Sequence, residues 1–211
     1  MELMKLSCEA FLADLAGSSP APGGGGAAAL VGAAGAALSN MVGALTVGKK
    51  KYAAVEADIL ALNERSAALR QKLEHLVQAD AEAFAPLAAA YRLPKETPAQ
   101  QAVKAAALEA ALDGACAVPL AILDACGEGI ALAVEYAEKG SVLAVSDAGC
   151  AALFCKAAME AAGLNVSINT KLMADRAKAK ALNARADALL AEYAPLADKL
   201  YEKLAHQLRE E

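Results

Sequence analysis

Apolar residues recur every three or four positions through most of the chain, which is the spacing of one face of an α-helix. The longest such stripe predicts a helix over about residues 52–91, which Pro94 ends and Pro86 kinks. Polar residues interrupt the stripe at two positions, Ser66 and Asp80. Its apolar members are Val55, Ile59, Leu62, Leu69, Leu73, Leu76, Phe84, Leu87 and Tyr91.

Residues 27–46 show a different pattern, because small residues occupy most positions and few large apolar side chains occur. Such a segment predicts a helix that is buried on most sides, where Gly32 and Gly35 let neighbouring helices approach closely. A short helix is expected before it, over about residues 8–16, with Ser7 as its N-cap.

Start and stop signals predict the helices of the second half of the chain. A capping box made by Thr97 and Gln100 begins a helix over about residues 98–139. Gly163 is expected to end the next helix, since glycine often follows a helix C-terminus. The last long helix is then expected from about Ile168.

The composition supports an all-α fold. About a quarter of the 211 residues are alanine, only 4% are aromatic and none is tryptophan, which argues against an all-β architecture. We predict one domain over residues 1–211, a bundle of five or six helices, several of them long and kinked at proline. Such long helices with wide apolar faces favour a homodimer.

Charge and cysteine content exclude several classes of protein. Because the chain contains 20 basic and 25 acidic residues, which give a formal net charge of −5, we expect no nucleic-acid partner. The uncharged segment between Asp14 and Lys49 is rich in glycine and alanine rather than leucine, so we expect no membrane span. Five cysteines without a CxxC pair, and Glu2 in place of the positive start of a signal peptide, predict free thiols and a cytoplasmic protein.

A run of four glycines opens the segment of small residues. It consists of Gly23, Gly24, Gly25 and Gly26 and directly follows Pro22. Bare backbone N–H groups at the start of a helix can approach a carboxylate, a phosphate or a polar heterocycle. The run is no P-loop, because Gly-Lys-Ser/Thr does not follow it. A tight turn between packed helices is the alternative interpretation.

Three lysines follow the same segment at its other end, namely Lys49, Lys50 and Lys51. Lysines at a helix C-terminus complement the helix dipole without any further function. The alternative is that one of them points into a cleft and holds an anionic substrate or donates a proton.

Asp80 is the strongest candidate for catalysis. One helical step from Leu76 and from Phe84, its carboxylate is expected to be desolvated, which raises its pKa unless a cation or hydrogen bonds compensate. Such a group can act as a general acid or base, although a structural carboxylate that caps another helix would give the same pattern. With only His75 and His206 in the chain, we expect neither a histidine-based metal site nor a Ser-His-Asp triad.

Three blocks, taken in order, resemble the cyclodeaminase/cyclohydrolase family, whose best-known member is the C-terminal half of formiminotransferase-cyclodeaminase. The blocks are SSPAPGGGG at residues 18–26, TVGKKKY at 46–52 and DAEAF at 80–84. Residues 146–147 and 165–169 also resemble family landmarks, so the likeness covers nearly the whole chain. Gly26 departs from the pattern, since many relatives carry serine there.

The resemblance implies an all-helical, dimer-forming enzyme that acts on tetrahydrofolate one-carbon derivatives, with no metal and no tightly bound cofactor. One activity that it implies is formiminotetrahydrofolate cyclodeaminase, which closes 5-formiminotetrahydrofolate to 5,10-methenyltetrahydrofolate with loss of ammonia in histidine degradation. A separate formiminotransferase is then a possible partner. The other activity is methenyltetrahydrofolate cyclohydrolase, in which water opens the methenyl ring. A non-catalytic folate-binding or scaffolding dimer is the alternative from another class.

For either reaction we expect Asp80 to exchange protons with the reacting nitrogens. Lys49 or Lys50 would orient Asp80 or bind the carboxylate tail of the substrate, and the glycine run with Pro22 would approach the flat pterin ring. The resemblance adds Lys51, Asp147 and Asn169 as substrate-binding candidates, although Asp147 after Ser146 also fits the first turn of a helix.

Overall fold

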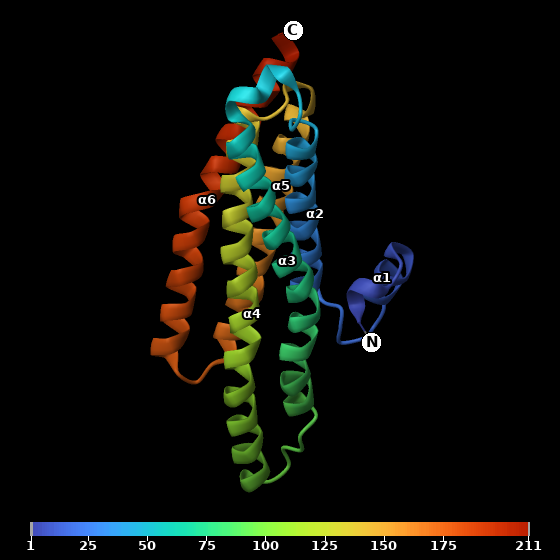
Figure 1. Ribbon diagram of the computed structural model, residues 1–211. Coiled ribbons are helices and arrows are strands. Elements are labelled where there is room, and N and C mark those ends of the chain that lie inside the picture. Colours follow the sequence, from blue (N-terminus) through green and yellow to red (C-terminus); the bar gives the residue numbers. More distant parts are fainter. Residues whose placement is uncertain (1, 211) are drawn as a thin grey trace.

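The computed structural model describes residues 2–210, and within them it contains α-helices and short 3-10 helices but no β-strand (Figure 1). The prediction of an all-α bundle is therefore confirmed. The α-helices are α1 (Cys8–Leu15), α2 (Gly24–Ala44), α3 (Glu56–Tyr91), α4 (Pro98–Lys139), α5 (Val145–Leu172) and α6 (Arg176–Glu210). The 3-10 helices are η1 (Leu3–Lys5), η2 (Lys50–Val55) and η3 (Val142–Ala144).

Helices α2 to α5 form the centre of the bundle. Helix α2 packs against α3 and α5, α4 packs against the same two helices, and α6 lies against α4 and α5. Figure 1 shows that α3 and α4 continue well beyond the first turn of α2, while α1 projects sideways from the bundle near that turn.

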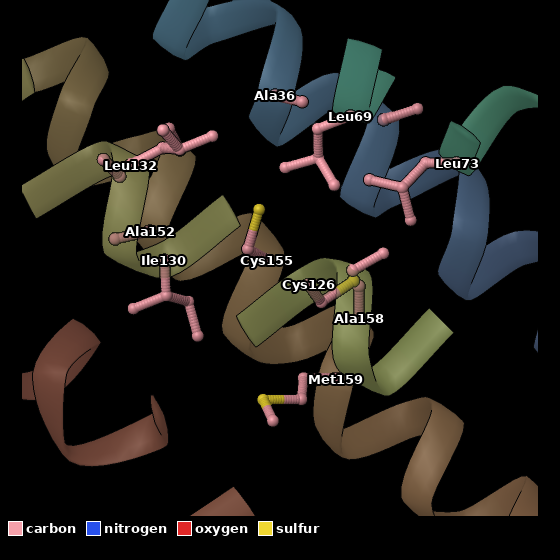
Figure 2. Packing of buried hydrophobic residues seen from close by; sticks show 14 of the residues in the cluster. Ala36, Leu69, Leu73, Cys126, Ile130, Leu132, Ala152, Cys155, Ala158 and Met159 are labelled. Atoms are coloured by element: carbon pink, nitrogen blue, oxygen red, sulfur yellow. The ribbon is translucent and has the colours of Figure 1, made fainter. Parts of the chain in front are cut away.

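The core is made mainly of small and branched aliphatic side chains. Figure 2 shows Cys126 of α4 and Cys155 of α5 on the opposite side of the core from Ala36 of α2 and from Leu69 and Leu73 of α3. A Cβ atom added to Gly35 would lie 2.9 Å from the backbone oxygen of Ala151, so glycine lets α2 approach α5 closely, as the sequence predicts. All five cysteines are free thiols; Cys116, Cys126 and Cys155 are buried, and Cys8 and Cys150 are exposed.

The start signals of two helices behave as predicted. The Ser7 side chain accepts a hydrogen bond from the backbone of Ala10 and caps α1. Thr97 and Gln100 form both hydrogen bonds of the capping box at the start of α4. The prolines inside α3, α4 and α6 interrupt none of these helices, which continue on both sides of them.

Two predicted boundaries are wrong. Gly163 does not end a helix but lies inside α5, where a Cβ atom would come within 3.2 Å of the Leu190 side chain of α6. This glycine therefore serves helix packing rather than helix termination. As a result α5 continues to Leu172, and the last helix begins at Arg176 instead of Ile168.

Three segments of the chain are apolar enough to raise the question of whether they cross a membrane. By length and composition, α2, α4 and the segment Val142–Leu172 are long and apolar enough to cross one. In each of these helices, half or more of the most apolar stretch is buried against the rest of the bundle. Their apolar residues therefore serve in large part to pack the helices on one another.

Candidate active site

A cleft of about 340 Å³ lies at the start of α2, a size within the usual range of small-molecule sites. The last third of α3, the middle of α4 and the end of α5 supply its other walls. Asp80 is the only charged residue among the lining residues of the described chain. The lining consists of Pro20, Gly23, Gly24, Gly25, Asp80, Ala83, Phe84, Tyr91, Ala115, Pro119, Asn165, Ile168, Asn169 and Leu172.

Asp80 binds the first turn of α2. The backbone N–H of Gly26 donates a hydrogen bond of 2.8 Å to Asp80 Oδ2, although the two residues are 54 positions apart in the sequence. Helix α2 has no side-chain N-cap of its own, so its first N–H groups are free to bind an acceptor. The positive end of the helix dipole also favours a carboxylate at this place.

Glycine is required beside this carboxylate. A Cβ atom on Gly25 would lie only 2.2 Å from Asp80 Oδ1, so any side chain there would displace Asp80. At Gly24 the nearest atom, Nδ2 of Asn165, lies 3.4 Å away, and at Gly26 the nearest is the Val77 oxygen, also at 3.4 Å. Both of these positions have room for a small side chain. Within the glycine run, it is therefore Gly25 whose lack of a side chain lets α2 approach Asp80 closely.

The environment of Asp80 suits proton transfer. Burial raises the pKa of the Asp80 carboxyl, and the hydrogen bond from Gly26 opposes that rise in part. The side chain is only partly buried and faces the cleft, so a ligand can reach it. A carboxyl with a raised pKa in a cleft is typical of a general acid or base. Asp80 thus binds the first turn of α2 and also faces the cleft, so the helix cap and the site acid that the sequence left as alternatives are compatible with each other.

Two asparagines of α5 form the polar part of the opposite wall. Asn169 donates from Nδ2 to the Ala115 backbone oxygen at 2.7 Å, and Asn165 donates from Nδ2 to the Ala161 oxygen at 2.9 Å. These bonds fix both amide planes and leave each Oδ1 as an acceptor for a ligand. Asn169 lines the cleft, as the family resemblance implies.

An aromatic wall of the cleft was not identified from the sequence. Phe84 and Tyr91 lie on α3, one and three helical turns after Asp80, and both line the cleft. Aromatic rings favour offset stacking with flat ligands. The signal available in the sequence was their spacing of four and eleven residues from Asp80, which places them on the same face of one helix.

The structure does not bring the lysines into this cleft within one chain. Lys49, Lys50 and Lys51 follow the C-terminus of α2 and are exposed, and the 21 residues of the helix span about 30 Å. Asp147 lies in the first turn of α5. The backbone N–H of Val142 donates to the Tyr52 hydroxyl at 3.0 Å, so the start of α5 lies near this lysine end.

Of the residues that the sequence singles out, the glycine run, Asp80 and Asn169 therefore lie together. The lysines and Asp147 lie together at the other end of α2.

The chain is similar to known proteins over nearly its full length. A family model described as formiminotransferase-cyclodeaminase matches residues 7–188. The methenyltetrahydrofolate cyclohydrolase of Methylorubrum extorquens is 47% identical over 194 residues, which cover 92% of this chain and 93% of that protein. The formimidoyltransferase-cyclodeaminase of Rattus norvegicus is 35% identical over 90% of this chain, and the match spans 35% of the rat protein.

A solved structure has the same fold. The formiminotetrahydrofolate cyclodeaminase of Thermotoga maritima superposes with a TM-score of 0.81 and 28% sequence identity, covering 97% of this chain and all of that one. Because the family model covers most of the chain, and the Methylorubrum protein is 47% identical over more than nine-tenths of both chains, this protein belongs to the formiminotransferase-cyclodeaminase family.

Proposed function

We propose that this protein is a folate one-carbon enzyme that opens 5,10-methenyltetrahydrofolate to 10-formyltetrahydrofolate, a methenyltetrahydrofolate cyclohydrolase. The observation that carries this proposal is the 47% identity to the Methylorubrum enzyme, which extends over 92% of one chain and 93% of the other. The site supports it, because a single carboxylate faces the cleft between flat apolar and amide surfaces.

Asp80 fits the charge of this substrate. The methenyl carbon lies between N5 and N10 and shares a positive charge with them, so a nearby carboxylate stabilises it. In the first step a water oxygen bonds to this carbon, and Asp80 accepts one proton of the water. The product of the step is a neutral tetrahedral carbon that carries a hydroxyl group.

The second step breaks the bond between N5 and the tetrahedral carbon. The protonated Asp80 donates its proton to N5, while the hydroxyl loses its proton to solvent and becomes the carbonyl of the formyl group on N10. One water is consumed and one proton is released overall. The raised pKa of Asp80 suits both steps, because the same carboxyl must accept and return a proton.

The rest of the cleft would bind and orient the pterin. The bare backbone of Gly23 and Gly24 lets a flat ring approach the start of α2, and Phe84 offers a surface for stacking. The amide oxygens of Asn165 and Asn169 can accept hydrogen bonds from the N–H groups at the pterin edge. Such positioning would hold the reacting carbon next to Asp80.

Formiminotetrahydrofolate cyclodeaminase is the second candidate activity. The Thermotoga protein of the same fold and the rat relative both carry cyclodeaminase in their names. In that reaction N10 attacks the formimino carbon, and Asp80 would protonate the nitrogen that leaves as ammonia. A formiminotransferase would then have to supply the substrate, and the match to this chain spans 35% of the rat formimidoyltransferase-cyclodeaminase.

One assay distinguishes these activities. The purified protein is given 5,10-methenyltetrahydrofolate and, in parallel, 5-formiminotetrahydrofolate, and the absorbance of the methenyl compound is followed while ammonia is measured. We expect faster loss of the methenyl compound than in buffer alone. Formation of the methenyl compound with release of ammonia would favour the cyclodeaminase instead. Folate binding without turnover of either substrate would contradict both and favour a non-catalytic binding protein.

A further inference from the structure

Three prolines lie in the interior of α-helices within residues 2–210, namely Pro86 in α3, Pro119 in α4 and Pro195 in α6. A proline has no backbone N–H, so in each helix the carbonyl oxygen four residues earlier loses its usual hydrogen-bond partner. A buried carbonyl oxygen without a partner destabilises the fold. Each freed oxygen therefore needs another donor, from water or from the protein. The residues that carry these oxygens are Glu82, Ala115 and Ala191.

Pro119 differs from the other two prolines in its surroundings. Pro86 and Pro195 are exposed, and so are the residues four positions before them, so water can bind the freed oxygens. Pro119 is buried and Ala115 is only 5% exposed, so the Ala115 oxygen needs a donor from the protein. Both residues line the cleft, which places this break in the helical hydrogen bonding in a wall of the candidate active site.

Asn169 supplies the missing donor. Its Nδ2 lies 2.7 Å from the Ala115 oxygen, and this hydrogen bond joins α5 to α4 across 54 positions of the sequence. Asn165, the other asparagine of the same wall, donates instead to the oxygen of Ala161, four residues earlier in its own helix. The orientation of the Asn169 amide therefore depends on α4, whereas that of Asn165 depends on α5 alone.

The orientation of the Asn169 amide decides what a ligand meets at this wall. An asparagine side chain carries donors on its nitrogen and an acceptor on its oxygen. The bond to Ala115 engages Nδ2 and leaves Oδ1 as an acceptor, so the wall suits a ligand edge that carries N–H groups. A backbone N–H at position 119 would compete for the Ala115 oxygen, and the Asn169 amide could then turn and present either group.

We propose that Pro119 is a positioning residue of the cleft. Because it carries no N–H, it leaves the Ala115 oxygen to Asn169, and this bond holds the Asn169 amide with its oxygen toward the ligand, where it selects a ring edge that carries N–H groups. That the ring is a pterin, which has an amino group and ring N–H groups along its edge, rests on the proposed function. The coupling between Pro119 and Asn169 does not, and it can be measured without any ligand.

Thermal unfolding tests the coupling. In the parent chain Asn169→Ala should lower Tm by about 3–6 °C, because the buried Ala115 oxygen is left without a donor. In a Pro119→Ala background the restored N–H can bind that oxygen, so the same change should lower Tm much less. Pro119→Val restores the same N–H with a larger side chain and should give the same coupling. Equal shifts with and without Pro119 would overturn the proposal.

Asn165→Ala is the matched control for the unfolding measurement. It removes an amide from the same wall, but the partner of that amide, the Ala161 oxygen, lies in α5 and does not depend on position 119. Its effect on Tm should therefore be the same with proline or alanine at position 119. A coupling of Asn165 to position 119 as large as that of Asn169 would mean that Pro119 acts through general packing of the wall, which would also overturn the proposal.

Calorimetric titration with 5-formyltetrahydrofolate, a stable one-carbon folate, tests the selection of the ligand. Pro119→Ala and Asn169→Ala should each bind it about tenfold more weakly than the parent, and the double variant no more weakly than Asn169→Ala alone. Pro195→Ala, the same substitution at an exposed position of α6, should bind like the parent. Unchanged binding by Pro119→Ala, or losses that multiply in the double variant, would overturn the proposal. A parent protein that neither binds nor turns over a folate would instead refute the proposed function, and the unfolding measurement would still decide the coupling.

Discussion

The two ends of α2 carry opposite charges and have opposite surroundings. At its start, the backbone of Gly26 binds Asp80 in a cleft that four helices surround. Beyond its end, Lys49, Lys50 and Lys51 are exposed, and the ammonium of Lys51 lies 5.5 Å from the centre of the neighbouring Tyr52 ring. The helix dipole favours the carboxylate at the first turn, whereas the last turn of α2 contains no basic residue.

This difference shows that a charged group becomes a candidate for chemistry when it is partly desolvated beside walls that can hold a ligand. Asp80 is partly desolvated and lies next to walls that can hold a ligand, so its charge is available for chemistry. Lys49, Lys50 and Lys51 lie in solvent beyond the end of the helix and line no part of this cleft.

The largest expected effect comes from the carboxylate at the start of α2. Asp80→Asn should lower kcat/KM by about 10²- to 10⁴-fold, because the amide keeps the bond from Gly26 but cannot exchange protons. Steady-state kinetics on the methenyl substrate check this. Glu82→Gln, an exposed carboxylate on the same helix, is the control and should retain its activity. Normal turnover of Asp80→Asn would remove this residue from the mechanism.

The next largest effect is expected at Gly25, the glycine that lies directly against the Asp80 carboxylate. Gly25→Ala should reduce kcat/KM about a hundredfold, because its Cβ would displace the Asp80 carboxylate from its bond to Gly26. Gly24→Ala is the matched change, one residue earlier with its nearest neighbour at 3.4 Å, and should be much milder. Equal losses in both variants would mean that the run serves something other than Asp80.

A smaller effect is expected at the other end of the helix. Replacing Lys49, Lys50 and Lys51 by alanine tests the expectation that they bind the carboxylate tail of the substrate, and it should then raise KM about tenfold with little change in kcat. In the parent protein, added salt should raise KM as it screens this attraction, and the variant should lose that salt dependence. A fall in kcat at constant KM would instead place a lysine next to the reacting atoms.

The smallest effect concerns stability against pH. Burial raises the pKa of Asp80 in the folded chain above its value in the unfolded chain, so the folded state binds more protons between the two pKa values. Stability should therefore fall slightly as pH rises through that window. Thermal unfolding of the parent and of Asp80→Asn across this range measures the difference, and the variant should lack this contribution. A steeper loss of stability toward acid pH in the parent than in the variant would contradict the assigned direction.

The sequence alone determined the helices and the candidate acid. Spacing of apolar residues and capping signals are local, so the boundaries of α4 and the polar interruption at Asp80 could be predicted from neighbours in the chain. The fold class followed for the same reason, because the alanine-rich composition and the helical period agree throughout.

Only the tertiary structure decided which of these residues meet. Gly25 and Asp80 come together because α2 and α3 pack side by side, and the aromatic wall forms because α3 continues beyond the start of α2. Gly163 likewise owes its place to contact with α6 rather than to its own helix. Distances between helices depend on how their faces pack, and the local pattern of one helix does not contain that information.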